Sequence, residues 1–169
     1  MARLVLAGCA WVLLACGALA QGQAPALSGP ARIFSTDAII VGDNVVAFRL
    51  WGVDAPEPGQ TCWIDEQEWD CFGGALDKLE ELITGKLVTC SLRQDSNRTR
   101  RGKIYAVCLN ADRVDLALAM VEAGWALAVV DQTKDYVPAE EAAEKAGIGM
   151  WRGSFEEPWV FLDQLRGGN

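Results

Sequence analysis

Residues 49–57 read Arg-Leu-Trp-Gly-Val-Asp-Ala-Pro-Glu, and the rest of the chain is organised around this stretch. An apolar run over residues 45–53 predicts a strand that leads into it. The strand must stop at Pro56, because proline has no N–H to give to a ladder of hydrogen bonds. Fixed backbone at a strand end holds side chains for chemistry, and three charged residues lie there: Arg49, Asp54 and Glu57. A strand followed by an ordinary polar turn also accounts for this stretch taken alone.

Further motifs surround the stretch in a fixed order. They are Asp37 between two apolar runs, Arg-Gly-Lys at 101–103, the helix ending at 121–126, the last helix with its sequel at 136–151, and the closing Gly-Ser-Phe-Glu-Glu-Pro-Trp at 153–159. Together with residues 49–57, these motifs resemble the staphylococcal-nuclease-like (thermonuclease) family. The resemblance covers roughly residues 31–160. It rests on the ordered set, since no single motif in it is decisive.

The resemblance implies an α+β fold, a small five-stranded β-barrel of the oligonucleotide/oligosaccharide-binding type with three helices. Hydrophobic spacing alone predicts the elements but not the barrel. Helices are predicted over 72–84, 115–123 and 138–146, strands over 31–41, 45–53, 87–92, 104–109 and 126–130, and a loop over 54–71. We expect one domain over residues 31–163, with a tether at 21–30 before it and a tail at 164–169 after it.

The resemblance also implies a role for each polar group of the site. The carboxylates of Asp37 and Asp54 and the backbone carbonyl of Ala55 are oxygen ligands of the kind that suits Ca²⁺. Glu57 is expected to act on the attacking water. Arg49 is expected to bind a phosphate through its planar fork, which can meet two oxygens at once.

Three departures from the family's pattern count against high activity. Residues 35–38 read Ser-Thr-Asp-Ala where the family usually has Asp-Gly-Asp-Thr, so one acid and one hydroxyl near the metal are gone. Lys103 stands in the place of a second catalytic arginine; it keeps the charge but loses the bidentate fork. Residues 129–135 carry two acids where the family commonly offers aromatic and basic side chains.

The charge of the chain is unusual for a protein that binds a polyanion. The net charge is −8, and it becomes −9 when residues 1–20, with one arginine and no acid, are removed. A local basic patch can outweigh net charge. Such a patch lies within residues 93–103, where Arg100 and Arg101 are candidate substrate-binding residues. A solvated hairpin tip explains the same run equally well.

Four cysteines follow the first twenty residues: Cys62, Cys71, Cys90 and Cys108. An even count in an exported chain predicts disulfides, with three alternative connectivities. Antiparallel pairing of the strands at 87–92 and 104–109 places Cys90 opposite Cys108, which leaves Cys62 for Cys71. The rival reading is a metal cluster, and it is disfavoured because the chain has no C-x-x-C spacing and no histidine.

Residues 1–20 start with one positive charge, continue as an apolar run and end in Ala-Leu-Ala. This pattern predicts a secretory signal peptide, and the run is too interrupted to predict a spanning helix. Leu-Leu-Ala-Cys at residues 13–16 also resembles a bacterial lipobox, so a lipid-anchored form is the alternative. We expect a periplasmic or secreted protein with no membrane span.

Two functional hypotheses remain open. The first is an exported, calcium-dependent nuclease, a slow phosphodiesterase or endonuclease that acts as a monomer on single-stranded DNA or RNA. The second is a non-catalytic domain of the cell envelope that binds a ligand or a protein through the same site. A third possibility, a disulfide-stapled envelope protein, has neither role. The joint presence of Arg49, Asp54 and Glu57 favours the first, and the loss of the second arginine favours the others.

Overall fold

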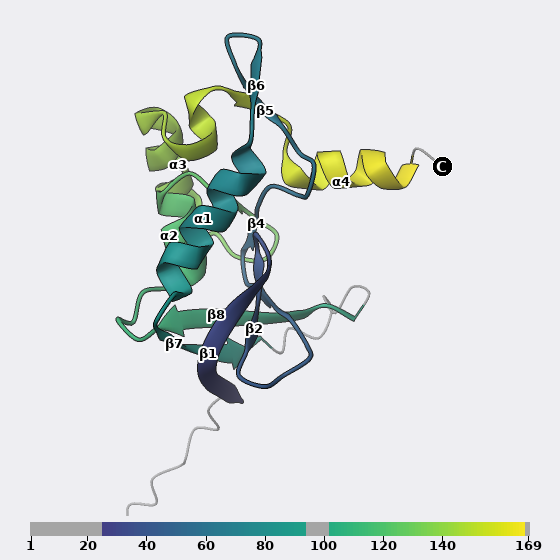
Figure 1. Ribbon diagram of the computed structural model, residues 1–169. Coiled ribbons are helices and arrows are strands. Elements are labelled where there is room, and N and C mark those ends of the chain that lie inside the picture. Colours follow the sequence, from purple (N-terminus) through teal and green to yellow (C-terminus); the bar gives the residue numbers. More distant parts are fainter. Residues whose placement is uncertain (1–24, 94–101, 168–169) are drawn as a thin grey trace, which may run out of the picture.

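The computed structural model describes residues 25–93 and 102–167. Five of its strands pair in a ring, in the order β1 (Ala26–Ser35), β2 (Ala38–Val41), β3 (Phe48–Leu50), β8 (Ile104–Asn110) and β7 (Leu87–Leu92). The β3–β8 pair is parallel and the other four pairs are antiparallel. Figure 1 shows β7 and β8 below the helices, with β1 crossing in front of them. The expected small five-stranded barrel and the α+β class are confirmed.

Strand β1 closes the barrel because its two halves pair with different neighbours. Its first half, from Ala26 to Pro30, pairs with β7, and its second half pairs with β2. The strand therefore begins inside the segment expected as a tether, and that expectation is wrong from Ala26 onward. This half contains one large apolar residue, Leu27, so its composition resembles a linker. The expected strand over residues 31–41 is likewise broken by a turn at Thr36 and Asp37.

The three predicted helices are present within a residue of their expected bounds. Helix α1 (Cys71–Ile83) is capped by Asp70, whose carboxylate accepts the N–H of Gly73 at 2.7 Å. Helix α2 (Leu116–Glu122) is capped in the same way by Asp115. Helix α3 (Val137–Ala146) ends at Gly147 in the left-handed region. Figure 1 shows these three helices gathered on one side of the barrel.

The structure adds elements that the sequence did not predict. Helix α4 (Pro158–Gly167) runs through the expected end of the domain at residue 163 and through most of the expected tail. Pro158 is its only fully buried residue, and Val160, Phe161 and Leu162 are partly buried. In Figure 1 it extends away from the other helices. Among the described residues there are thus four α-helices rather than three. None of them has the length and apolar character that crossing a membrane requires.

The remaining short elements fill the expected loop and the end of the chain. Strands β5 (Cys62–Ile64), β6 (Gln67–Trp69) and β10 (Ser154–Phe155) form a small sheet in the order β10-β5-β6. A one-turn 3-10 helix, η2 (Gly149–Arg152), precedes β10. Strand β4 (Val53–Asp54) leaves the barrel to pair with β9 (Leu127–Ala128). The expected strand over residues 45–53 is therefore split into β3 and β4.

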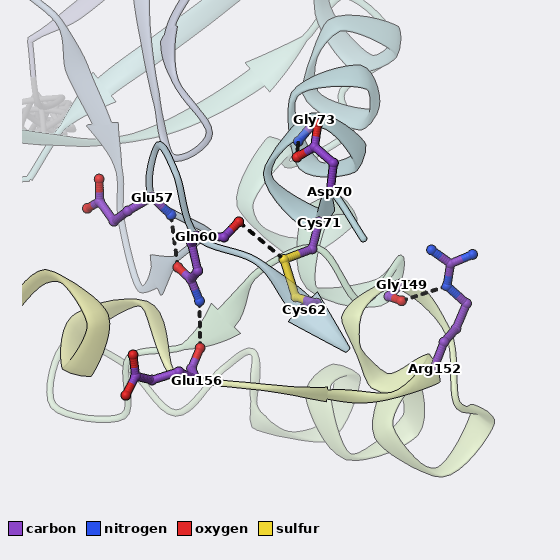
Figure 2. Close-up of a disulfide and its surroundings, with 9 residues drawn as sticks. All are labelled: Glu57, Gln60, Cys62, Asp70, Cys71, Gly73, Gly149, Arg152 and Glu156. Atoms are coloured by element: carbon purple, nitrogen blue, oxygen red, sulfur yellow. Dashed lines mark hydrogen bonds between the residues drawn. A yellow bond between two sulfur atoms is a disulfide. The ribbon is translucent and has the colours of Figure 1, made fainter. Parts of the chain in front are cut away.

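Both predicted disulfides are formed. Cys90 and Cys108 face each other in the β7–β8 register, and their bond lies in the barrel core. Cys62 and Cys71 join β5 to the start of α1 (Figure 2), and both belong to a second, smaller core cluster. The main core lies between the barrel and helices α1 and α2, and its fully buried members include Ile39, Leu50, Leu79, Leu116 and Met120.

Candidate active site

The strand register assembles the polar residues that the sequence singled out. Ala38 of β2 pairs with Arg49 of β3, and Arg49 pairs in turn with Tyr105 of β8. Asp37 directly precedes β2, and Lys103 directly precedes β8. Three separate segments of the chain therefore place one carboxylate, Asp37, and two cations, Arg49 and Lys103, at the same part of the barrel.

Asp37 is held on three sides. Its side chain is 5 % exposed and forms an ion pair with the guanidinium of Arg49. The hydroxyl of Ser35 donates to the other carboxylate oxygen at 2.6 Å, and the backbone carbonyl of Asp37 accepts the N–H of Leu50 at 2.8 Å. Ser35 occupies the place of an acid in the related family, yet here it still contributes a polar contact to Asp37.

Asp54 is brought to the site by two links. The pairing of β4 with β9 sets Asp54 opposite Leu127, and the hydroxyl of Thr36 donates to the carbonyl of Pro56 at 2.7 Å, tying the turn at Asp37 to the turn after β4. Burial, and after it the negative charges of Asp37 and Glu57, together raise the pKa of Asp54 to about 7. Three carboxyl groups therefore lie close enough to repel one another.

Glu57 follows the turn and is half buried. Its backbone N–H donates to the side-chain oxygen of Gln60 at 3.0 Å, and the amide of Gln60 donates to the carbonyl of Glu156 at 2.6 Å (Figure 2). Burial, and after it the charge of Asp37, raises the pKa of Glu57. The buried Gln60 was not predicted, and it fixes the loop that carries Glu57 to the C-terminal part of the chain.

Lys103 lies at the site as a partly buried ammonium. Burial lowers its pKa, and the positive charge of Arg49 lowers it further. The two cations are therefore close enough to act on the same anion. The other basic candidates, Arg100 and Arg101, lie outside the described residues.

These side chains open onto a pocket of about 420 Å³. The lining includes four of the predicted site residues: Asp37, Arg49, Asp54 and Lys103. Glu57 and the buried Ala55 are adjacent to them in the chain fold but do not line this pocket. The rest of the wall comes from Val53, Tyr105, residues 128–132 and Trp159. The acidic run after β9 therefore faces the site, with Asp131 in the lining.

Three of the wall residues with polar or aromatic side chains, Tyr105, Gln132 and Trp159, were not predicted as site residues, although the strand pattern could have indicated the first. Tyr105 lies two positions after Lys103, and alternate residues of a strand share a face, so β8 should carry both to the site. The side-chain oxygen of Gln132 accepts the N–H of Gly52 at 2.9 Å. The two residues are 80 positions apart in sequence, and no sequence pattern indicates their contact. Trp159 belongs to α4, the helix that was not predicted.

The donor set fits a hard cation held by few protein ligands. Within residues 25–93 and 102–167, no three carboxylate, cysteine or histidine side chains meet as a metal cluster. Two carboxylates, Asp37 and Asp54, do line one pocket, and burial together with the charge of Asp37 disfavours the ionisation of Asp54. With Asp131 the described residues of the pocket wall hold three carboxyl groups against two cations, Arg49 and Lys103. Oxygen donors in excess of local positive charge suit Ca²⁺, with water completing its shell.

The fold and the pocket together define a small α+β barrel domain with a pocket that carries carboxylates, an arginine and a lysine. The family model of staphylococcal nuclease homologues matches residues 47–153, and the chain belongs to that family. A comparison with curated proteins found no match. Membership supports a nuclease-like domain and indicates nucleic acid as the class of partner. The two disulfides are compatible with a location outside the cytoplasm.

Proposed function

We propose that the pocket binds a phosphodiester of single-stranded DNA or RNA, and that the protein is an exported, calcium-dependent nuclease with a low rate. One observation carries the proposal. Four segments of the chain converge on one pocket and bring to it the predicted carboxylates Asp37 and Asp54 and the predicted cations Arg49 and Lys103. Glu57, outside the lining, lies near enough for the charges of Asp37, Arg49 and Lys103 to act on it.

Each side chain has a role in the proposed hydrolysis. Glu57 takes a proton from water as the water oxygen forms its bond to phosphorus. The bond from phosphorus to the leaving oxygen breaks, and that oxygen keeps the electron pair and is protonated by solvent. Arg49 and Lys103 stabilise the charge that grows on the phosphate oxygens. The raised pKa of Glu57 makes it a stronger base than an exposed carboxylate.

Asp37, Asp54 and the carbonyl of Ala55 are the groups proposed to hold Ca²⁺. When bound, the cation would supply positive charge to the phosphate and to the crowded carboxylates. The raised pKa of Asp54 supports this assignment, because a site in which ionisation is disfavoured gains from a nearby cation. Arg100 and Arg101 remain proposed as further phosphate contacts, on the resemblance alone.

The pocket walls favour an unpaired strand as the substrate. Tyr105 and the 37 % exposed Trp159 offer aromatic surface on which an unstacked base can lie. We also propose that residues 1–20 direct export, that the mature protein is periplasmic or secreted, and that it acts as a monomer. The disulfides support the compartment, since such bonds persist in oxidising surroundings.

A second candidate is a non-catalytic domain that binds its ligand through the same pocket. Two observations favour it: Asp131 adds a negative charge to the pocket wall, and Lys103 lacks the fork of an arginine. This candidate predicts ligand binding without turnover. The two candidate functions therefore differ in one observable: the nuclease forms cleaved product and the binding domain does not.

The test is incubation of the purified protein with labelled single-stranded DNA, single-stranded RNA and duplex DNA, first with calcium and then with a chelator. The proposed nuclease cleaves the single strands with calcium and stops when calcium is removed. Binding without any cleavage supports the second candidate. Neither binding nor cleavage contradicts both.

A further inference from the structure

Helix α4 lies against the pocket as a separate wall. Trp159 in its first turn lines the pocket, and the neighbouring Pro158 is buried. The segment before the helix is anchored to the Glu57 loop, because Gln60 donates to the carbonyl of Glu156 at 2.6 Å. Gln164 of the helix donates to the side chain of Glu156 at 2.5 Å. The helix is therefore docked on the same loop that carries Glu57.

Arg166 shares the pocket-facing side of α4 with Trp159. The two residues are seven positions apart, which is close to two full helical turns, so they lie on one face, roughly 10 Å apart along the axis. Burial and the charge of Arg49 are the larger causes that lower the pKa of Lys103, and the positive charge of Arg166 adds to them. Arg166 is thus within electrostatic reach of Lys103, which comes from a different segment of the chain.

The guanidinium of Arg166 is available to a ligand. Its side chain is 47 % exposed, and its ion-pair partner among the described residues is the exposed Asp163 at 3.8 Å. That distance is too long for a hydrogen bond, so the pair leaves the N–H donors of Arg166 uncommitted. The guanidinium of Arg49, by contrast, is engaged by the buried Asp37.

We propose that α4 is a substrate-binding element and that Arg166 supplies to the phosphate backbone the guanidinium that Lys103 does not supply. Trp159, on the same helix face, stacks on a base of the same strand. The inference rests on the proposed nucleic-acid function and names a further cation for it. It accounts for a working phosphate site in a chain whose net charge is −8, because one planar fork binds two phosphate oxygens where an ammonium meets them at a point.

The test measures binding of a short, fluorescently labelled oligothymidylate with calcium, in a Glu57→Gln background that prevents cleavage. Arg166→Ala should weaken binding about tenfold or more, since a charge-assisted contact is lost. The slope of log K against log salt should become shallower by about 0.7, the share of one phosphate contact on a single strand. Arg166→Lys should keep the slope and recover part of the affinity.

Two further variants separate the roles on the helix. Lys145→Ala removes an exposed cation from the last turn of α3 and is the matched control; it should change neither affinity nor slope. Trp159→Ala should weaken binding without changing the salt slope, because stacking releases no counterions. Circular dichroism verifies that each variant keeps its helices.

The outcomes distinguish this inference from the function on which it rests. If the background protein binds the strand and Arg166→Ala behaves as Lys145→Ala does, the role of α4 is wrong while the proposed function stands. If the background protein binds no strand at any salt concentration, the proposed function fails and this inference fails with it. A loss of affinity in Arg166→Ala with an unchanged slope also overturns the phosphate contact.

Discussion

The guanidinium of Arg49 and the carboxylate of Asp37 form a largely buried ion pair, with side chains 18 % and 5 % exposed. The register that sets Ala38 opposite Arg49 produces this pair. In the proposed function these two groups serve different ligands, Asp37 a cation and Arg49 a phosphate. Each ligand competes with the pair, so occupation of one group frees the other. Binding of the two ligands should therefore be coupled, and by linkage the coupling is reciprocal.

Asp37→Asn tests this coupling. In the presence of a chelator, the variant should bind a single-stranded oligonucleotide several-fold more tightly than the wild-type protein, because Arg49 is released and one negative charge is removed. Calcium should no longer improve binding. Fluorescence anisotropy measures both effects. Asp43→Asn, which removes an acid from an exposed turn, is the control, and tighter binding in both variants or in neither would contradict the coupling.

The raised pKa of Asp54 leads us to expect that the calcium-free protein loses stability as the pH rises toward neutrality. Its pKa rises from 3.8 to about 7 on folding, so its neutral form is the one that suits the fold. Its contribution to stability is fully present below about pH 4 and is lost as the pH rises through 7. A shift of this size corresponds to a few kcal/mol at most, on the scale of about 1.4 kcal/mol per unit.

Asp54→Asn should therefore melt several degrees above wild type at pH 8 in chelator, with the advantage shrinking toward pH 4. Added calcium should raise the melting temperature of the wild-type protein by mass action and leave the variant unchanged. Thermal melts across the pH series measure both effects. If Asp54→Asn were less stable than wild type at pH 8 without calcium, the ionised carboxylate of Asp54 would not destabilise the fold, and this account of Asp54 would be wrong.

The site residues that could be predicted lie on short, strongly patterned stretches. Arg49, Asp54 and Glu57 share one strand end, and the ordered motifs around them pointed to Asp37. The Cys90–Cys108 bond followed from the alternation of two strands about a hairpin. In each case neighbours in sequence, or one simple register, determine the contact.

The parts that could not be predicted depend on long-range partners. Residues 26–30 form a strand because β7 offers them an edge, and nothing in their own composition requires it. Helix α4 fully buries only Pro158 and lies where the end of the domain and a tail were expected, so neither Trp159 nor Arg166 was predicted as a site residue. Thr36 donates to the carbonyl of Pro56, twenty residues further along the chain, and no local motif indicates this contact.

Gln60 provides a test of how the Glu57 loop is positioned. Gln60→Ala removes the bonds to the N–H of Glu57 and to the carbonyl of Glu156, which should lower the free energy of unfolding by about 1–3 kcal/mol. Because Glu57 is proposed to act on water rather than to bind substrate, kcat should fall while KM changes little. Gln67→Ala, at an exposed position of β6, should do neither. A normal kcat in Gln60→Ala would show that the contacts of Gln60 do not position Glu57 for its action on water.

A double-mutant cycle tests whether Arg166 compensates for the lysine at position 103. Lys103→Arg alone should raise kcat/KM, because the phosphate gains a fork. In the Arg166→Ala background the same substitution should raise it by a larger factor, about tenfold or more, since Arg166 then no longer compensates for the ammonium of Lys103. Initial rates for the four proteins give the coupling. If Lys103→Arg raised kcat/KM by the same factor in both backgrounds, the two cations would act independently. That result would contradict the proposal that Arg166 compensates for Lys103.

The most direct test of the central claim compares initial cleavage rates of one single-stranded DNA by the wild-type protein, Glu57→Gln and Glu80→Gln with calcium present. Glu80 is an exposed carboxylate on α1 and controls for the loss of an acid. The proposed mechanism predicts measurable wild-type cleavage, a loss of about a hundredfold or more in Glu57→Gln, and no change in Glu80→Gln. Wild-type cleavage that survives in Glu57→Gln, or a rate indistinguishable from zero in all three proteins, would contradict it.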